Sequence, residues 1–189
     1  MILSDRGILE EMEKGTLVIK NFARECLGPA SYDMRLRKHV FRSSTGKVHN
    51  LEEEQVITIE PNEELKLPRS ICGRFGLRSH FTRKGLIWSG GPQIDPGFEG
   101  VLSVTIYNPG SRPVPIRYLE NFCTVEFTWL KTEASREYSG PYQGLTSFPP
   151  NDLVFLSGYK GLTMFELSKS LDELEAGIEK LSNRLKYFT

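Results

Sequence analysis

The sequence has no excess of charge of either sign, because 24 Lys and Arg residues balance 24 Asp and Glu residues. This balance gives no indication of a nucleic-acid or membrane-surface partner. No apolar run approaches the roughly 20 residues that a membrane-spanning helix needs. The opening segment MILSDRGILEEMEKG carries acids within its apolar pattern, unlike a signal peptide.

Cysteine is also scarce, with only Cys26, Cys72 and Cys123 in the chain. Their number is odd and their spacing is not that of metal ligands, which fits a reducing compartment. Internal repeats are absent as well. Together these features predict a soluble, cytoplasmic protein, and 189 residues are sufficient for one domain with a core of its own.

Short alternating segments dominate residues 16–132. They are rich in Val, Ile, Phe and Thr and are separated by Pro, Gly and Asn, a pattern typical of β-strands. Strands are expected in the segments LVIKNF, SYDMRLRKHVF, QVITIEP, EELKLP, GRFGLRS, GVLSVTIYN and FCTVEFTWL. Many short strands of this kind predict an all-β sandwich or jelly roll.

Helices are expected at both ends of the chain. Residues 4–14 should form a short helix, with Ser4 as its N-cap and Gly15 at its end. A polar stretch with Gly and Pro follows the last expected strand. We therefore divide the chain into a β domain, a linker or arm, and a C-terminal helix, over residues 1–145, 146–163 and 164–189.

The C-terminal segment carries a heptad pattern. Six apolar residues recur at alternating spacings of four and three, namely Leu167, Leu171, Leu174, Ile178, Leu181 and Leu185. Charged residues fill many of the other positions. The pattern fits an amphipathic helix that lies on the β core, and it fits equally a self-associating coiled coil or a partner-binding helix.

The segment GRFGLRSHFTRKGL, residues 73–86, gathers basic side chains and glycines. Guanidinium groups, a hydroxyl and glycine-exposed backbone amides are suited to binding a polyphosphate. A basic edge strand would give the same pattern, so the residues alone leave both interpretations open.

Five blocks in chain order resemble the dCTP deaminase/dUTPase superfamily, on its deaminase side. They are MILSDRGI, PASYDMRL, GRFGLRSHFTRKGL, IDPGFEG and GPYQG, between residues 1 and 144. The resemblance implies a distorted jelly roll, the dUTPase-like β-clip, over residues 1–145. It also implies a homotrimer with sites between subunits, dUTP or dCTP as substrate, and Mg²⁺ bound through the phosphates without direct protein ligands.

Site residues are carried over from the family's motifs. The resemblance assigns Asp95 and Ser79 catalytic roles, and Asp33 either a shared family role or that of a buried structural acid. His80 replaces a serine of the family pattern. The residues implied to bind substrate are Arg78, Ser79, His80, Arg83, Gly91, Ile94, Asp95, Phe98, Ser103, Val104, Thr105, Thr124, Tyr138, Tyr142 and Gln143.

One departure from the deaminases concerns the base of the reaction. Their strand after the IDPGF turn ends in a glutamate that activates water, and Thr105 holds that place here. A threonine hydroxyl is not a base at neutral pH without a partner. The pattern instead resembles the dUTPase branch, in which the turn aspartate, here Asp95, orients the attacking water.

Three functions follow from this mixture. Hydrolysis of dUTP to dUMP and pyrophosphate, with Asp95 as the base, is the principal expectation. The first alternative is a non-catalytic nucleotide-binding or scaffold protein. The second is a dCTP deaminase with a substitute base such as His80. Asp95 also has a simpler interpretation, as an Asx-type turn residue before Pro96 and Gly97.

Overall fold

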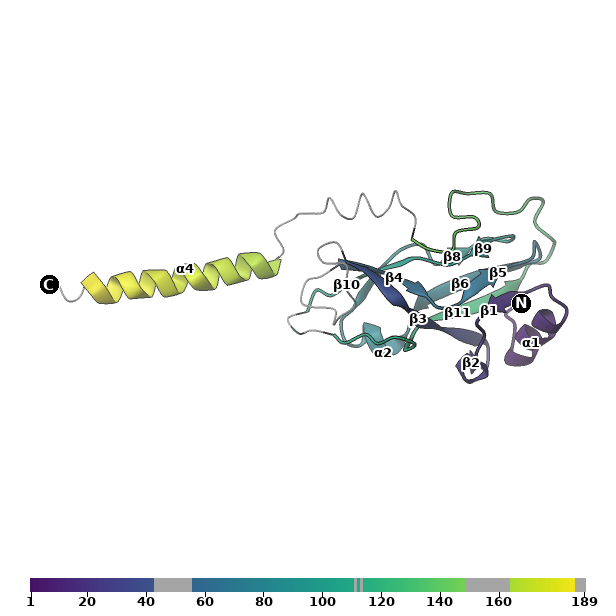
Figure 1. Cartoon of the computed structure of the whole chain (residues 1–189), viewed down its shortest axis with the longest axis horizontal. Helices are drawn as coiled ribbons and strands as arrows, with labels where there is room; N and C mark the ends of the chain where they lie inside the picture. The colour runs from purple at the N-terminus through teal and green to yellow at the C-terminus, as the bar shows by residue number, and fades with distance from the viewer. Residues whose placement is uncertain (43–55, 111, 113, 149–163, 186–189) are drawn as a thin grey trace.

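The computed structural model describes residues 1–42, 56–110, 112, 114–148 and 164–185. Most of these residues belong to a β domain, and a long helix extends from its end (Figure 1). The all-β jelly-roll class expected from the sequence is confirmed. Each of the seven segments predicted as strands contains one. The strands are β1 (Val18–Lys20), β2 (Leu27–Gly28), β3 (Ser31–Arg42), β4 (Val56–Pro61), β5 (Glu64–Lys66), β6 (Ile71–Leu77), β7 (Ile87–Ser89), β8 (Gln93–Ile94), β9 (Glu99–Gly100), β10 (Val104–Tyr107) and β11 (Asn121–Trp129).

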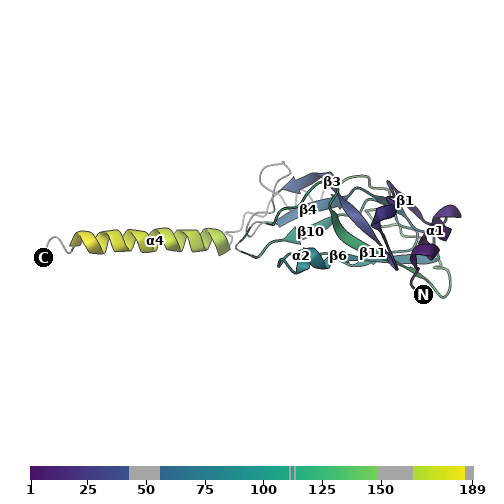
Figure 2. The ribbon, with the colours of Figure 1, turned by 90° about the horizontal axis from the view of Figure 1, so that it is seen from below.

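Two antiparallel sheets make up the β domain. The smaller has the order β1-β5-β9, and the larger runs β7-β10-β4-β3-β11-β6-β8, with β2 paired to β3. Figure 2 shows the strands gathered in one body, with the N-terminal helix at the end opposite the C-terminal helix. The β4–β10 pair matters most for the site. Ile57 and Ile59 of β4 and Val104 and Ile106 of β10 are at most 2% exposed and belong to the core.

The N-terminal helix α1 (Asp5–Glu13) follows the sequence signals. The Ser4 hydroxyl accepts a hydrogen bond from the Gly7 amide at 3.3 Å, as an N-cap does. Ile8 is fully buried in the core. The segment after β6 forms a short helix, α2 (Ser79–Thr82), so Ser79 and His80 do not lie on an edge strand, whereas the preceding residues 73–77 belong to β6.

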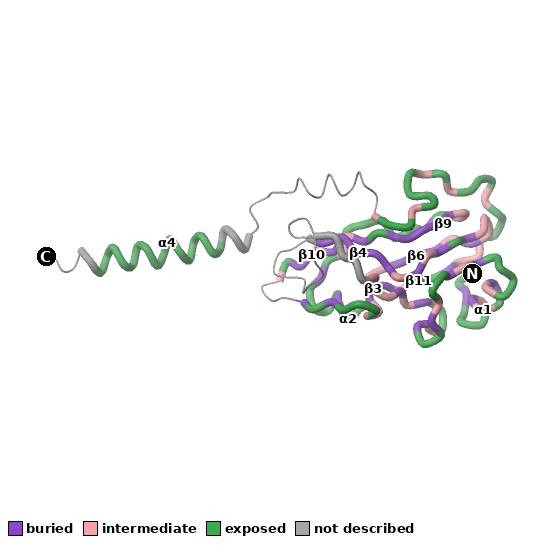
Figure 3. The backbone as a smooth tube through the Cα atoms, in the orientation of Figure 1, coloured by how far each residue is buried: buried purple, intermediate pink, exposed green. Residues whose placement is uncertain are grey.

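The C-terminal helix α4 (Met164–Leu185) confirms the predicted amphipathic helix. Leu171, Leu174, Ile178 and Leu181 are 60–65% exposed, and Figure 3 colours this part of α4 as exposed. The heptad residues therefore do not lie on the β core in this structure, and a partner for them stays a prediction. The side chains of Leu167 and Leu185 lie outside the described set. Among the described helices, none is long and apolar enough to span a membrane.

Candidate functional site

The turn from Asp95 to Phe98 is held by its backbone. The Phe98 amide donates to the Asp95 carbonyl at 3.1 Å, and Gly97 adopts a φ of +81°, as the third position of a type II turn requires. The Asp95 carboxylate is exposed and has no hydrogen bond or ion pair to any described residue. The side chain is therefore free for another role.

A hollow of about 300 Å³ opens beside this turn. Its walls contain seven residues predicted from the sequence, namely Gly91, Ile94, Asp95, Phe98, Ser103, Tyr138 and Tyr142. Sequence reasoning missed five others, Phe75, Gln93, Val101, Leu102 and Leu145. Aromatic and apolar walls with a few polar groups are typical of a small-molecule site.

Residues 137–146, which we call the arm, are docked on the turn. The Tyr138 amide donates to the Pro96 carbonyl at 2.9 Å, and the Val101 amide donates to the Leu145 carbonyl at 2.8 Å. A Cβ on Gly97 would lie 2.5 Å from the Cβ of Glu137. Because its φ is also positive, only glycine permits this close approach.

Gln143 was predicted to bind substrate, and in this structure its amide group fixes the arm. Its Nε2 donates to the Gly97 carbonyl at 2.9 Å, and its Oε1 accepts from the Glu99 amide at 3.1 Å. The Tyr138 ring packs on Phe98, with 5.8 Å between the ring centroids. The arm therefore forms one wall of the hollow.

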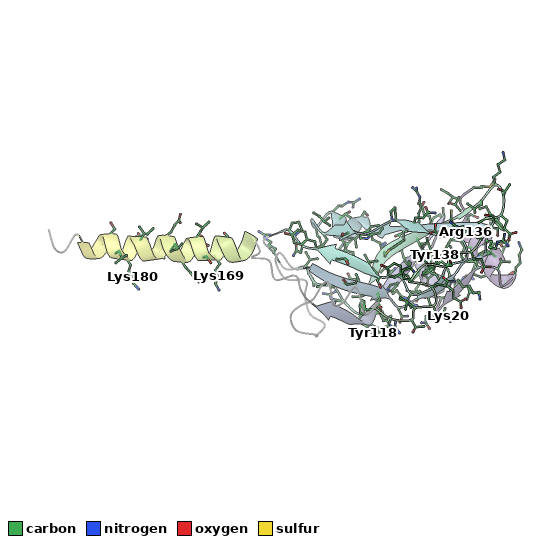
Figure 4. All side chains as sticks on the ribbon, turned by 90° about the horizontal axis from the view of Figure 1, so that it is seen from above. Lys20, Tyr118, Arg136, Tyr138, Lys169 and Lys180 are labelled. Atoms are coloured by element: carbon green, nitrogen blue, oxygen red, sulfur yellow. The ribbon has the colours of Figure 1, made fainter. Side chains whose placement is uncertain are left out.

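A second hollow, of about 590 Å³, also borders the turn. It is bounded by Asp95, Pro96 and residues 134–140. Figure 4 shows Arg136 and Tyr138 at the part of the β domain far from α4. Asp95 thus borders both hollows.

A further group of predicted residues lies in α2 or near it. Arg78 Nη1 lies 3.3 Å from Asp33 Oδ2, and the Thr124 hydroxyl donates to Asp33 Oδ1 at 2.6 Å. Asp33 therefore orients Arg78 and is only partly buried. The remaining three, Ser79, His80 and Arg83, are exposed. We call this set the Arg78 cluster, and its charge is suited to phosphate binding.

The Arg78 cluster and the Asp95 turn are separated along β6. Gly73 pairs with Ile94, next to Asp95, and Arg78 follows the last residue of β6, Leu77. Five residues of strand span about 17 Å. Within one chain, the two halves of the predicted site therefore do not meet.

Thr105 and Val104 occupy opposite faces of β10. Val104 is 1% exposed and its side chain belongs to the core, so only its backbone is available to a ligand. Thr105 is partly buried, and its hydroxyl oxygen lies 3.1 Å from that of Thr58 on β4. The position expected to carry a carboxylate in a deaminase thus carries a hydroxyl, which lies beside the hydroxyl of Thr58.

The structure reveals a titratable residue that sequence reasoning missed. Glu60 of β4 is 1% exposed. Burial raises the pKa of its carboxyl from 4.5 to about 7, against the opposing effect of Arg37. Arg37 Nη1 lies 3.4 Å from Glu60 Oε2, and Glu60 Oε1 has no hydrogen-bond partner among the described residues. The sequence offers one signal that could have found Glu60, namely that it shares one side of an alternating strand with Thr58.

Glu60 should make the stability of the protein depend on pH. A raised pKa means that folding favours the protonated acid, so the stabilisation is present at low pH and is lost as pH rises through about 7. Glu60→Gln is expected to be near neutral at pH 5 and stabilising at pH 8.5, by at most about 3 kcal/mol. Urea unfolding at both pH values tests this. A difference between variant and wild type that does not change with pH would contradict it.

The comparisons with known proteins agree with this geometry. The family model described as dCTP deaminase-like matches residues 41–128. A dCTP deaminase of Pyrococcus furiosus is 35% identical over 154 residues, covering 77% of this chain and 94% of its own. The protein of Aquifex aeolicus named "dCTP deaminase, dUMP-forming" is 29% identical over 169 residues, covering 80% of this chain and 94% of its own. The deaminase crystal structure from Agrobacterium tumefaciens matches with a TM-score of 0.57 and 19% identity, over 67% of this chain and 47% of that one.

The jelly roll, the Asp95 turn and the Arg78 cluster define a protein of the dCTP deaminase/dUTPase superfamily. Within it, the chain belongs to the dCTP deaminase family. These relatives favour the deaminase alternative over dUTP hydrolysis, which was the principal expectation from the sequence.

Proposed function

We propose that the protein is a dCTP deaminase, which converts dCTP and water to dUTP and ammonia. The observation that carries the proposal is the hollow where the Asp95 turn, Ser103 and the arm meet. Its apolar and aromatic walls are suited to a pyrimidine nucleoside, and its backbone and hydroxyl groups are suited to reading the ring edge. The likeness to proteins named dCTP deaminase supports this choice of substrate.

We also propose that the site is completed by assembly. The Arg78 cluster offers guanidinium groups and a hydroxyl to a triphosphate, but it lies about 17 Å along β6 from the Asp95 turn. A homotrimer in which the cluster of one copy meets the turn of another would unite them. Mg²⁺ held through the phosphates would neutralise their charge, and the exposed Asp95 carboxylate fits beside such a complex.

A second activity, hydrolysis of dUTP to dUMP and pyrophosphate, is favoured by Asp95 itself. Its carboxylate is exposed, has no partner among the described side chains, and borders both hollows. In this role Asp95 would orient a water molecule for attack on the α-phosphorus. The similarity to a relative named "dUMP-forming" supports adding this step to deamination.

Incubation with dCTP or dUTP and Mg²⁺ tests both activities. We expect ammonia release from dCTP, with dUTP or dUMP separated by ion exchange. Formation of dUMP from dUTP supports the second activity. Binding of both nucleotides without any product would contradict catalysis and favour the non-catalytic alternative.

A further inference from the structure

The side of the β4–β10 pair that carries Thr105 also carries a carboxylate. Thr105 pairs with Thr58 in the antiparallel register. Glu60 lies two residues beyond Thr58 on β4, so it points to the same side of the sheet. Diagonal neighbours on adjacent strands lie about 7–8 Å apart and remain within reach of long side chains.

Glu60 differs from the other buried acids of the described chain. Glu11 is paired with Lys14 and Thr16, and both oxygens of Glu63 accept hydrogen bonds from Arg35. Glu60 has one contact, at 3.4 Å, and an oxygen with no partner among the described residues. An unpaired buried oxygen is costly and requires an explanation, and a ligand that supplies the missing partner is one.

The surroundings connect Glu60 to the hollow. Arg37 Nη1, its ion-pair partner on β3, also donates to the Thr146 carbonyl of the arm at 2.7 Å. The neighbouring arm residue Leu145 lines the hollow, as does Ser103, which directly precedes β10. Arg37 therefore joins Glu60 to the arm, at the residue next to one that lines the hollow.

We propose that Glu60 is the catalytic carboxylate of this protein and acts from β4 at the place where Thr105 offers only a hydroxyl. The inference rests on the proposed deamination of dCTP. It concerns a residue that the family pattern does not assign, and it replaces His80 as the substitute base expected from the sequence. His80 is exposed and lies in α2, not on the β4–β10 pair that carries Thr105.

The proposed chemistry balances with water as the only co-reactant. The Glu60 carboxylate takes a proton from water while the water oxygen bonds to C4 of cytosine, and it delivers this proton to N3. It then takes the proton of the new C4 hydroxyl and passes it to the amino group. The C4–N bond breaks, ammonia leaves, and the ring becomes uracil with a C4 carbonyl.

Such a base must be ionised before water attacks. Arg37 is the charged group that contacts Glu60, and it also donates to the arm carbonyl of Thr146. The hydroxyls of Thr58 and Thr105 lie on the same side of the β4–β10 pair. Because the pKa of Glu60 is raised to about 7, activity should rise with pH through this region. A base that titrates near the working pH is suited to moving protons in both directions.

Glu60→Gln is the direct test, because glutamine keeps the size of the side chain and a contact for Arg37. We expect ammonia release from dCTP to fall by about 10² to 10³-fold, with a flat pH profile. The KM of the variant for dCTP should stay within about twofold of the wild-type KM, and calorimetry should show that the variant still binds dCTP. That binding shows that the variant is folded.

Arg37→Gln is the matched control for a structural role. If Glu60 only holds Arg37 against the arm, both variants should lose activity equally and neither should shift the pH profile. If Glu60 is the base, removing the cation raises its pKa further, so the activity of Arg37→Gln should move to higher pH and approach the wild-type plateau there.

The outcomes separate the two proposals. Wild-type ammonia release that is lost in Glu60→Gln supports the inference. Release that persists in Glu60→Gln within about threefold overturns the role of Glu60 and leaves the deaminase proposal standing. No release from the wild-type protein overturns the deaminase proposal, and the role of Glu60 with it.

Discussion

Asp95→Asn is expected to lower dUTP hydrolysis by about 10²-fold or more, the usual scale for losing a general base. Asparagine cannot accept the proton of the attacking water. The fold should be unaffected, because the turn is held by the backbone hydrogen bond between Asp95 and Phe98 and by the conformation of Gly97. The measurement is pyrophosphate release from dUTP and Mg²⁺.

Glu99→Gln provides a matched control for this prediction. It removes the same charge four residues away, from a carboxylate that lies 2.8 Å from Lys66 Nζ rather than in the hollow. Hydrolysis should then change by less than about threefold. Asp95→Asn should also lower hydrolysis more than ammonia release, because Glu60 is the proposed base for deamination. Hydrolysis by Asp95→Asn at the wild-type rate would mean that Asp95 is only a turn residue.

The main strands and both long helices could be predicted because their signals are local. β3, β4 and β11 each coincide with an alternating run of several residues, and α1 begins after a capping serine. β7, β8 and β9 are only two or three residues long. They are defined by pairing with distant strands, such as β8 with β6 and β9 with β5. A pattern within two residues cannot indicate such a partner.

The candidate site divides in the same way. Asp95 and Phe98 could be found from the family's turn motif, and the structure places both at the hollow. Arg78 and its neighbours were predicted from another motif of the family, but the sequence could not show that about 17 Å of β6 separates them from Asp95. The distance depends on strand pairing. The homotrimer proposed to unite the two halves of the site depends on contacts between copies of the chain.

Glu60 shows why alternation alone does not predict burial. In the run VITIEP, Thr58 and Glu60 fall on the polar side of the strand, which would face water in a sheet with one exposed face. Here both are buried, at 6% and 1% exposure. The Arg37 side chain lies against Glu60 and is itself bonded to the arm carbonyl of Thr146, 86 residues further along the chain than Glu60. Contacts over this separation are not visible in a local pattern.

Thr105→Glu in a Glu60→Gln background is expected to restore ammonia release at least about tenfold over Glu60→Gln alone. It returns a carboxylate to the strand position that bears the base in the family pattern. The background matters because two carboxylates on one side of the β4–β10 pair would raise each other's pKa. In the double variant one carboxylate is present, and the hydroxyl of Thr58, now 3.1 Å from that of Thr105, can donate to it.

The control for this restoration is Thr105→Gln in the same background, which adds the same bulk without a base. It should remain at the level of Glu60→Gln alone. Calorimetric titration with dCTP establishes that both double variants still bind the substrate. A Thr105→Glu double variant that binds dCTP but releases no more ammonia than its glutamine counterpart would contradict the placement of C4 beside β10. A misplacement of only about 1 Å can cost roughly 10²-fold in rate, so recovery would fix the ring position closely, between the Asp95 turn and the β4–β10 pair.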